Sequence, residues 1–179
     1  MPTPRIRPAH SSDREQVMQV HRLAFPEEER EAVATLAGSM LDAVSQPQAL
    51  TLVAEHDEEL VGAIAFSPLR FTPDEGWRGY ILSPLGVLPR SHGQGVGGQL
   101  IKAGLQQLQQ NGVNVVLVYG DPAYYGRFGF SADAARDYLP PHELEMPFGW
   151  QAALLQGRRG QGGALQCACE GLLGDPGYW

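Results

Sequence analysis

The sequence predicts an α+β fold built on a mixed central sheet. Two apolar runs, Leu50 to Glu55 and Leu60 to Phe66, flank a short polar segment, which is typical of an antiparallel hairpin. Further on, a strand-like run from Ile81 to Leu88 leads through a glycine-rich turn and a helical pattern to an apolar run, Val113 to Val118. That order predicts a right-handed crossover between two parallel strands. We therefore expect a sheet of about six to seven strands, accompanied by about four helices.

The N-terminal segment is expected to hold a short strand and a first helix. Arg5-Ile6-Arg7-Pro8 is the strand candidate. Ser12 is predicted to cap the helix, because Ser12-Asp13-Arg14-Glu15 has the capping-box pattern, and Pro26 is predicted to end it. The apolar face of this helix comprises Val17, Val20, His21 and Ala24.

A second helix is predicted from apolar residues spaced three and four apart between Val33 and Val44. Four glutamates precede or begin it: Glu27, Glu28, Glu29 and Glu31. Acidic residues suit a helix N-terminus, and two interpretations stay open. The run is either a solvated face or an acidic wall that attracts an amine.

The prolines of the middle segment predict interruptions. Pro68 to Gly79 is expected to be a loop. Pro84 lies inside the following strand, where it cannot donate to a ladder, so it favours an edge, a bulge or a splayed strand. Asn111-Gly112 is expected to end the helix that follows the glycine-rich turn.

The remaining third of the chain is predicted to complete the sheet. A brief helix is expected to begin at Pro122 and end at Gly129. Leu139-Pro140-Pro141 is expected to be a linker or turn. Trp150 to Leu155 and Ala164 to Ala168 are expected to form a strand pair appended to the sheet. We thus expect a single domain over residues 1–179, with a core at 1–138 and C-terminal strands at 139–179.

Composition excludes several classes of protein. A net charge of −7 over 179 residues argues against nucleic-acid or anionic-membrane partners. Apolar runs fall short of the ~18 residues of a membrane span, and the N-terminus lacks a signal-peptide core, so a cytoplasmic location is expected. Cys167 and Cys169 would share one face of a strand and are expected to be reduced packing residues, and no metal site is expected.

A glycine-rich segment follows the predicted strand: Pro89-Arg90-Ser91-His92-Gly93-Gln94-Gly95-Val96-Gly97-Gly98. Four of its last six residues are glycines. Glycine tolerates positive φ, so such a loop can turn its amides inward. At the start of a helix, those amides make a site for phosphate. A plain strand-to-helix turn is the alternative, and the loop alone does not decide between them.

Three segments occur in one order: Pro84-Leu85-Gly86-Val87-Leu88-Pro89, His92-Gly93-Gln94-Gly95-Val96-Gly97, and Ala123-Tyr124-Tyr125-Gly126-Arg127-Phe128-Gly129-Phe130. Together they resemble the GNAT superfamily of acyl-CoA N-acyltransferases, and most closely its bacterial YhbS-like branch. The resemblance covers roughly residues 5–130. It implies the GNAT fold, in which strands 4 and 5 splay apart, and acetyl-CoA as cosubstrate.

The resemblance also implies a set of cofactor-binding residues. The loop would seat the pyrophosphate of coenzyme A through His92, Gly93, Gln94, Gly95, Val96, Gly97 and Gly98. The pantetheine arm would pair with strand backbone at Leu85, Gly86 and Val87, between the splayed strands. An amide of Val87 or Leu88 would face the thioester oxygen, a contribution of about 3 kcal/mol.

Tyr125 matches the tyrosine that members of the family use as general acid toward the departing thiolate, whose pKa is ~8.5. A half-buried aromatic that only orders the cofactor is the alternative. Tyr124 and Phe128 are expected to be packing or cofactor-wall residues. The family's loop has Gln or Arg where this chain has His92, and Arg90 is either a substitute cation or an exposed surface residue.

The general base is not identified by the sequence. The strand preceding the loop offers no carboxylate, so the candidates are Glu29, Glu31 and a water relayed by strand carbonyls.

The function implied is transfer of an acetyl group to a small-molecule or peptide amine by direct attack in a ternary complex. Neither cysteine suggests an acyl-enzyme. A non-catalytic acyl-CoA sensor is the alternative, and a dinucleotide-binding Rossmann unit is disfavoured because the glycines do not follow the first strand. A homodimer is left open.

Overall fold

The computed structural model describes residues 2–42, 48–160 and 162–179. The chain divides into two units, Met1–Phe66 with Ser83–Gly104 and Ser67–Leu82 with Leu105–Trp179. Strands β3 (Glu59–Thr72) and β4 (Gly79–Val87) and helix α3 (Val96–Gln110) each have residues in both units. This division does not follow the expected boundary at residue 138, and the single domain stays a prediction.

In the first unit, an antiparallel ladder joins β1 (Arg5–Pro8) to β2 (Leu50–His56) and β2 to β3. The β2–β3 connection is a two-residue turn in which Asp57 and Glu58 have φ of 49° and 63°. Left-handed conformations at both central residues match the twist of a hairpin. The predicted hairpin is confirmed.

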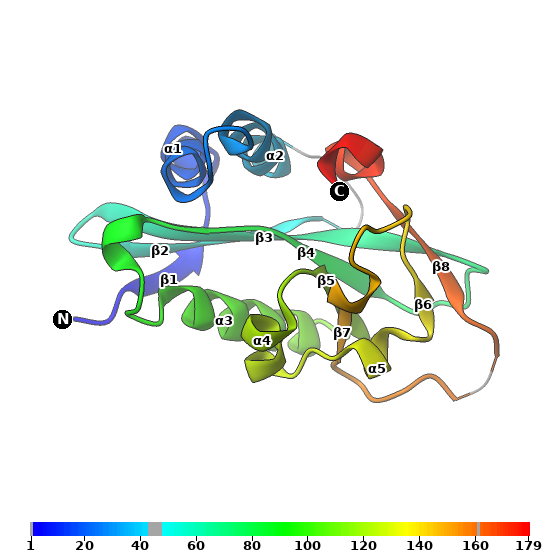
Figure 1. Ribbon diagram of the computed structural model, residues 1–179. Coiled ribbons are helices and arrows are strands. Elements are labelled where there is room, and N and C mark those ends of the chain that lie inside the picture. The colour runs from blue at the N-terminus through cyan, green and yellow to red at the C-terminus, as the bar shows by residue number, and fades with distance from the viewer. Residues whose placement is uncertain (1, 43–47, 161) are drawn as a thin grey trace. The chain divides into compact units, whose positions relative to one another are not determined.

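Helices cover both faces of these strands in Figure 1. Helices α1 (Arg14–Ala24) and α2 (Arg30–Asp42) lie on one side, and the first part of α3 lies on the other. The apolar face predicted for α1 is buried at Val17, Val20 and His21, and the helix ends two residues before Pro26. On the predicted face of α2, Leu36, Ala37 and Met40 are buried and Val33 and Leu41 are half-buried, whereas Val44 lies outside the described residues.

The predicted cap at Ser12 is wrong. A short 3-10 helix, η1 (Ser11–Asp13), precedes α1, and Asp13 accepts a hydrogen bond of 2.8 Å from the His10 amide. The Asp13 carboxylate also lies 2.8 Å from the Arg7 guanidinium of β1. This ion pair lowers the pKa of Asp13, chiefly through the hydrogen bond from Arg7. The Asp13 side chain therefore joins the turn before α1 to strand β1, and it makes no capping hydrogen bond to α1 itself.

Helix α3 packs closely on the sheet at one point. Leu100 and Ile101 are fully buried, and Gly104 lies against the ring of Phe66. A methyl group on Gly104 would stand 2.2 Å from Phe66 Cε2, far inside van der Waals contact. Only a residue without a side chain allows this helix–strand spacing.

In the second unit, β5 (Val115–Tyr119) lies between β4 and β7 (Trp150–Leu154). The parallel β4–β5 ladder joins only Gly79–Ile81 to Val115–Leu117, and it ends before Pro84. The β5–β7 ladder is antiparallel. A mixed sheet with splaying strands 4 and 5 is confirmed. Pro84 lies past the last pair of the β4–β5 ladder, so its missing N–H does not interrupt that ladder.

Strand β3 corrects the loop expected from Pro68. It continues to Thr72 and pairs there with β8 (Leu165–Cys169). Pro68 falls between the β2 ladder, which ends at Phe66, and the β8 ladder, which begins at Leu69. A missing N–H at that point interrupts neither ladder.

The C-terminal strands do not pair with each other, in contrast to the expected strand pair. β7 joins β5, whereas β8 joins β3 and a two-residue strand, β6 (Tyr138–Leu139). The expected turn at Leu139 is therefore part of a strand, and the sheet of the described residues has eight strands.

Short helices complete the structure. The brief helix expected after Pro122 is confirmed as α4 (Pro122–Tyr125) followed by η3 (Gly126–Phe128). The other short elements are η2 (Pro89–Ser91), α5 (Ala132–Ala135), η4 (Pro147–Gly149), η5 (Gly171–Gly174) and η6 (Pro176–Tyr178). Across the described ranges, no helix has the length and apolar character needed to cross a membrane.

Cys167 and Cys169 lie on the buried face of β8 as free thiols. Burial raises the pKa of Cys169 to about 12 and raises that of Cys167 as well. The prediction of reduced packing cysteines is confirmed.

Candidate active site

The glycine-rich loop runs from the end of β4 through η2 into α3. Gly93 and Gly95 have φ of 75° and 77°, a region that other residues rarely adopt. The first hydrogen bond of α3 runs from the Gln99 amide to the Gly95 carbonyl at 3.0 Å. The amides of the first three helical residues, Val96, Gly97 and Gly98, therefore have no acceptor within the helix. Such amides and the positive end of the helix dipole suit an anion.

Side chains of the loop are held by local contacts. His92 Nε2 lies 2.8 Å from the Val87 carbonyl, so this nitrogen carries the hydrogen and donates it. In the neutral ring only Nδ1 is left to face a ligand, as an acceptor. Arg90 lies 2.6 Å from Glu59 and is more than half exposed, which supports the surface interpretation of Arg90 over the substitute cation.

At the end of β4, backbone amides alternate between pointing toward β3 and pointing away from it. The Leu88 amide donates to the Val61 carbonyl of β3 at 2.8 Å, so Leu88 is unavailable as the thioester donor. Successive amides of an extended strand point to opposite edges. The amides of Leu85 and Val87 therefore point away from β3, and of the two predicted donors only Val87 remains.

Tyr125 is positioned by the turn between β5 and α4. Asp121 caps α4 by accepting from the Ala123 amide at 2.9 Å. The Tyr125 ring packs on Gly120, where a methyl group would stand 2.5 Å from Tyr125 Cε2. Burial, and to a lesser degree Tyr124, raises the pKa of the Tyr125 hydroxyl well above its usual range. The hydroxyl is thus protonated at neutral pH, as a proton donor must be.

Aromatic neighbours surround this ring. The centroids of Tyr124 and Phe130 lie 5.0 and 5.8 Å from that of Tyr125, both edge-on. Phe128 packs on Tyr124 at 5.5 Å, and the Arg127 guanidinium lies 4.8 Å from the Tyr124 centroid. Tyr124 and Phe128 thus belong to one aromatic group with Tyr125, and their role as walls of the cofactor site stays a prediction.

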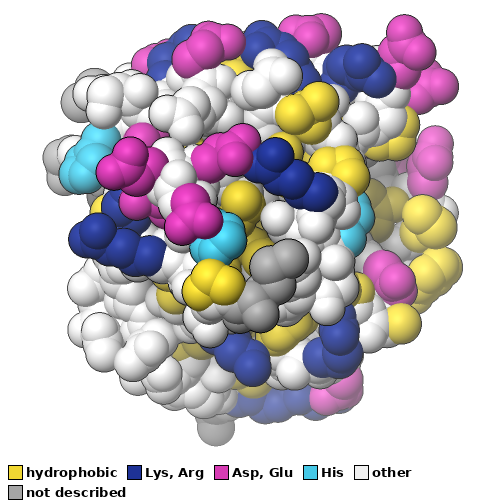
Figure 2. All heavy atoms as spheres, turned by 90° about the vertical axis from the view of Figure 1, so that its left-hand side faces the viewer, with side chains coloured by type: hydrophobic (Ala, Val, Ile, Leu, Met, Phe, Trp, Pro, Cys, Tyr) yellow, Lys and Arg dark blue, Asp and Glu magenta, His cyan; other side chains and the backbone are white. Residues whose placement is uncertain are grey.

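The carboxylates suggested as general base are solvated. Glu31 lies 3.1 Å from Arg22 and is more than two thirds exposed, and Glu29 is exposed as well. Acidic and basic side chains alternate along the top of the view in Figure 2, where α1 and α2 lie. These observations favour a solvated charged face over an acidic wall.

A buried histidine was missed as a functional candidate by sequence reasoning. His21 was predicted only as part of the apolar face of α1, and it is 1% exposed. Its Nε2 is buried and makes no hydrogen bond among the described residues. A histidine on an apolar helix face was the only signal in the sequence.

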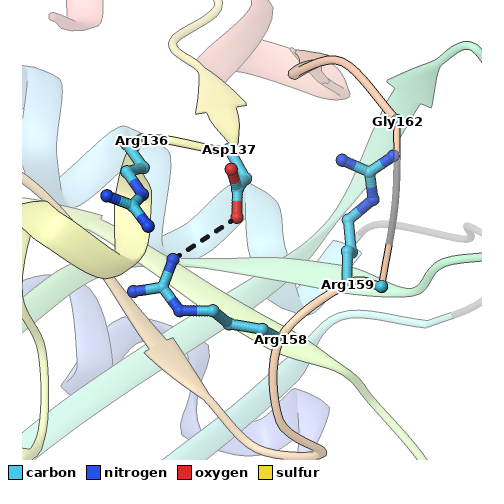
Figure 3. Close-up of a pocket in the computed structure, with 6 residues that line it drawn as sticks. Arg136, Asp137, Arg158, Arg159 and Gly162 are labelled. Atoms are coloured by element: carbon cyan, nitrogen blue, oxygen red, sulfur yellow. Dashed lines mark ion pairs between the residues drawn. The ribbon is translucent and has the colours of Figure 1, made fainter.

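A hollow of about 260 Å³ lies in the second unit, near the loop between β7 and β8 (Figure 3). It is lined by Arg136, Asp137, Arg158, Arg159, Gly160 and Gly162. Each arginine already has a carboxylate partner: Arg136 and Arg158 lie 3.3 and 2.6 Å from Asp133, and Arg159 lies 2.6 Å from Glu75. The charges are compensated, which makes this an ion-pair cluster that fastens the loop. Within the described ranges, no three His, Cys, Asp or Glu side chains gather as a metal site would require.

Comparison with known proteins identifies the family. A model of the acetyltransferase (GNAT) domain matches residues 5–132, which is more than half of the chain. The chain is a member of the GNAT family. The family match spans the glycine-rich loop, Tyr125 and the first strands, and the predicted fold and resemblance are confirmed.

Two curated relatives of this GNAT chain come from Escherichia coli K12. It is 36% identical over 113 residues to the uncharacterized N-acetyltransferase YjhQ, covering 62% of each chain. It is 41% identical over 90 residues to the uncharacterized N-acetyltransferase YhbS, covering 49% of this chain and 53% of YhbS. The matches thus span less than two thirds of either relative.

Solved structures of similar proteins hold coenzyme A. The E. coli YhbS structure, in complex with CoA, has a TM-score of 0.76 at 28% identity and covers 92% of this chain and 89% of its own. A GNAT acetyltransferase from Brucella melitensis, in complex with acetyl-CoA, has a TM-score of 0.67 at 30% identity and covers 96% and 97%.

Proposed function

We propose that this chain is an acetyl-CoA-dependent N-acetyltransferase that moves an acetyl group to an amine by direct attack in a ternary complex. One observation carries the proposal. The glycine-rich loop presents the amides of Val96, Gly97 and Gly98, which have no acceptor within the helix, after a strand whose Leu85 and Val87 amides point away from β3. Similar proteins bind coenzyme A or acetyl-CoA, which is the cosubstrate proposed here.

The residues present fit coenzyme A. A diphosphate needs several converging donors, and the first turn of α3 with the loop Gly93–Gly95 supplies amides rather than side chains. The pantetheine amides need strand-like partners, which Leu85 and Val87 offer because their amides point away from β3, with Gly86 between them. When bound, acetyl-CoA supplies an acyl carbon open to attack and a thiolate leaving group.

Two groups of this chain are proposed to assist the reaction. The Val87 amide donates to negative charge that develops on the acyl oxygen. The Tyr125 hydroxyl donates its proton to sulfur, and its raised pKa keeps that proton in place at neutral pH. Tyr124 packs edge-on against the Tyr125 ring, and Phe128 packs edge-on against Tyr124.

The test is release of free thiol from acetyl-CoA with a panel of amines: spermidine, a lysine-containing peptide, a peptide with a free N-terminus and an amino-acid amide. We expect release with at least one amine, and a fall in kcat of about 100-fold in Tyr125→Phe with the acetyl-CoA Kd unchanged. Tight acetyl-CoA binding without release would refute catalysis and favour the sensor function. A cytoplasmic location and a homodimer stay proposals.

A further inference from the structure

His21 of α1 carries a buried nitrogen with a defined protonation state. Its Nδ1 lies 2.8 Å from the Val17 carbonyl, and a carbonyl can only accept. Nδ1 therefore carries the hydrogen, and Nε2 of the neutral ring is a bare acceptor. That acceptor has no donor among the described residues, although the side chain is 1% exposed.

A buried polar atom without a partner is costly and calls for a physical explanation. Burial lowers the pKa of His21, opposed by the Val17 carbonyl, and these are the two influences on the ring. The ring is thus neutral near pH 7, with Nε2 free to accept a hydrogen. A water molecule is the smallest donor that such an acceptor holds in a protein interior.

The ring lies directly over β4 at Gly86. A methyl group on Gly86 would stand 2.9 Å from His21 Cδ2 and 3.1 Å from Nε2. Gly86 is buried, and it lies between the two residues whose amides point away from β3, Leu85 and Val87. The His21 ring therefore covers one face of the strand beside the proposed thioester donor.

The direction of attack makes this face important. If an acyl oxygen accepts from the in-plane Val87 amide, the carbonyl lies near the plane of the sheet. A nucleophile approaches a carbonyl carbon from above or below its plane. The amine must then arrive over one of the two faces of β4. The His21 ring lies over one of these faces, packed against Gly86, which has no side chain there.

We propose that His21 Nε2 is the general base of the reaction, acting through one water. This inference rests on the proposed function. As the amine nitrogen forms the new N–C bond, one of its protons passes to the water, and a proton of that water passes to Nε2. When the C–S bond breaks, sulfur takes the Tyr125 proton. The Val17 carbonyl stabilises the imidazolium through Nδ1–H until bulk solvent removes its proton, and solvent reprotonates Tyr125.

The test uses His21→Asn and His21→Gln in the full chain. Asparagine retains a donor for the Val17 carbonyl but has no counterpart of Nε2, so it separates the base from the structural bond. With the best amine of the panel, we expect kcat to fall about 100-fold in His21→Asn while the acetyl-CoA Kd stays within about 3-fold. His56→Gln is the matched control, because His56 Nε2 also has no hydrogen bond within the described part of the chain but lies at the end of β2.

A second readout does not depend on turnover. In a ¹⁵N spectrum of the imidazole at pH 7, we expect His21 to show a protonated Nδ1 and an unprotonated Nε2. A hydrogen on Nε2 would overturn the proposal. An active wild type with an equally active His21→Asn would overturn it too, leaving the proposed function intact. A wild type that releases no thiol with any amine refutes the proposed function, and the base with it.

Discussion

A methyl group on Gly120 should displace the Tyr125 ring without removing its hydroxyl. The substitution therefore tests whether the position of Tyr125 matters for the reaction. In Gly120→Ala the new Cβ would stand 2.5 Å from Tyr125 Cε2 and 3.0 Å from Cδ2. Carbon atoms pack best at about 3.5–4.0 Å, so the ring must move by about 1 Å. The ring has little room, because Tyr124 and Phe130 pack edge-on against it.

A displacement of about 1 Å at a reacting group can lower a rate about 100-fold. We therefore expect Gly120→Ala to lower kcat about 100-fold, with a loss of about 1–3 kcal/mol in the free energy of unfolding from overpacking. The assay is thiol release with the best amine, and unfolding is followed by circular dichroism. If the methyl group acts through Tyr125, then Gly120→Ala combined with Tyr125→Phe should be no slower than Tyr125→Phe alone.

Gly126→Ala is the matched control. Gly126 follows Tyr125 directly, has φ of −56°, and a methyl group there meets nothing within 4 Å. Alanine at this site should leave kcat unchanged and raise stability by about 0.4–1 kcal/mol. Unchanged kcat in Gly120→Ala, or additive losses in the double variant, would refute the reasoning that places Tyr125 at the reacting atoms.

Three further predictions follow from the described contacts. Gly95→Glu puts a negative charge in the loop at a residue whose φ of 77° is strained for glutamate, and it should abolish acetyl-CoA binding as measured by calorimetry. Gly76→Glu, also at positive φ, is the control and should leave binding unchanged. Equal affinities of the two variants for acetyl-CoA would refute the loop assignment. Asp13→Asn should cost about 2 kcal/mol at pH 7, because Arg7 loses one of its two carboxylate partners and retains Glu55. Since folding lowers the pKa of Asp13, its contribution is present above pH 3.8 and is lost as pH falls through the folded value; a gap from wild type that persists at pH 2 in chemical unfolding would contradict this. The Cys169 thiol, with its pKa raised to about 12, should react with a disulfide reagent only after unfolding, and rapid labelling of the native protein would count against its burial.

Local patterns in the sequence predicted the elements that depend on local physics. The β2–β3 hairpin, the apolar faces of α1 and α2, and the end of α3 near Gly112 all follow from periodicity and turn residues a few positions apart. The glycine-rich loop was found for the same reason, because positive φ at Gly95 is a requirement on one residue.

The errors concern partners that lie far apart in the chain. Ser12 was predicted to cap α1, but a 3-10 turn precedes that helix, and the Asp13 carboxylate in this turn bonds to the His10 amide and to Arg7 of β1. Proline usually interrupts a strand, but Pro68 lies between the end of the β2–β3 ladder and the start of the β3–β8 ladder, so β3 continues through it. The Leu88 amide faces β3 and donates to the Val61 carbonyl, so it cannot donate to a ligand. The sequence does not show which edge of the strand an amide faces.

The state of His21 could not be predicted either. A sequence gives the residue type and the helix face. The unpaired acceptor at His21 Nε2 depends on two tertiary details: Nδ1 donates its hydrogen to the Val17 carbonyl, and the ring packs against Gly86 of β4. The base therefore emerges from packing rather than from a motif.

The contact between Gly104 and Phe66 limits how this protein can be engineered. Glycine within a helix is a common target for thermostabilisation, since alanine gains about 1 kcal/mol at an open site. At Gly104 the same exchange would drive a carbon into the Phe66 ring at 2.2 Å. A stabilisation campaign would do better to shorten Phe66 together with the exchange, or to leave this turn of the helix untouched.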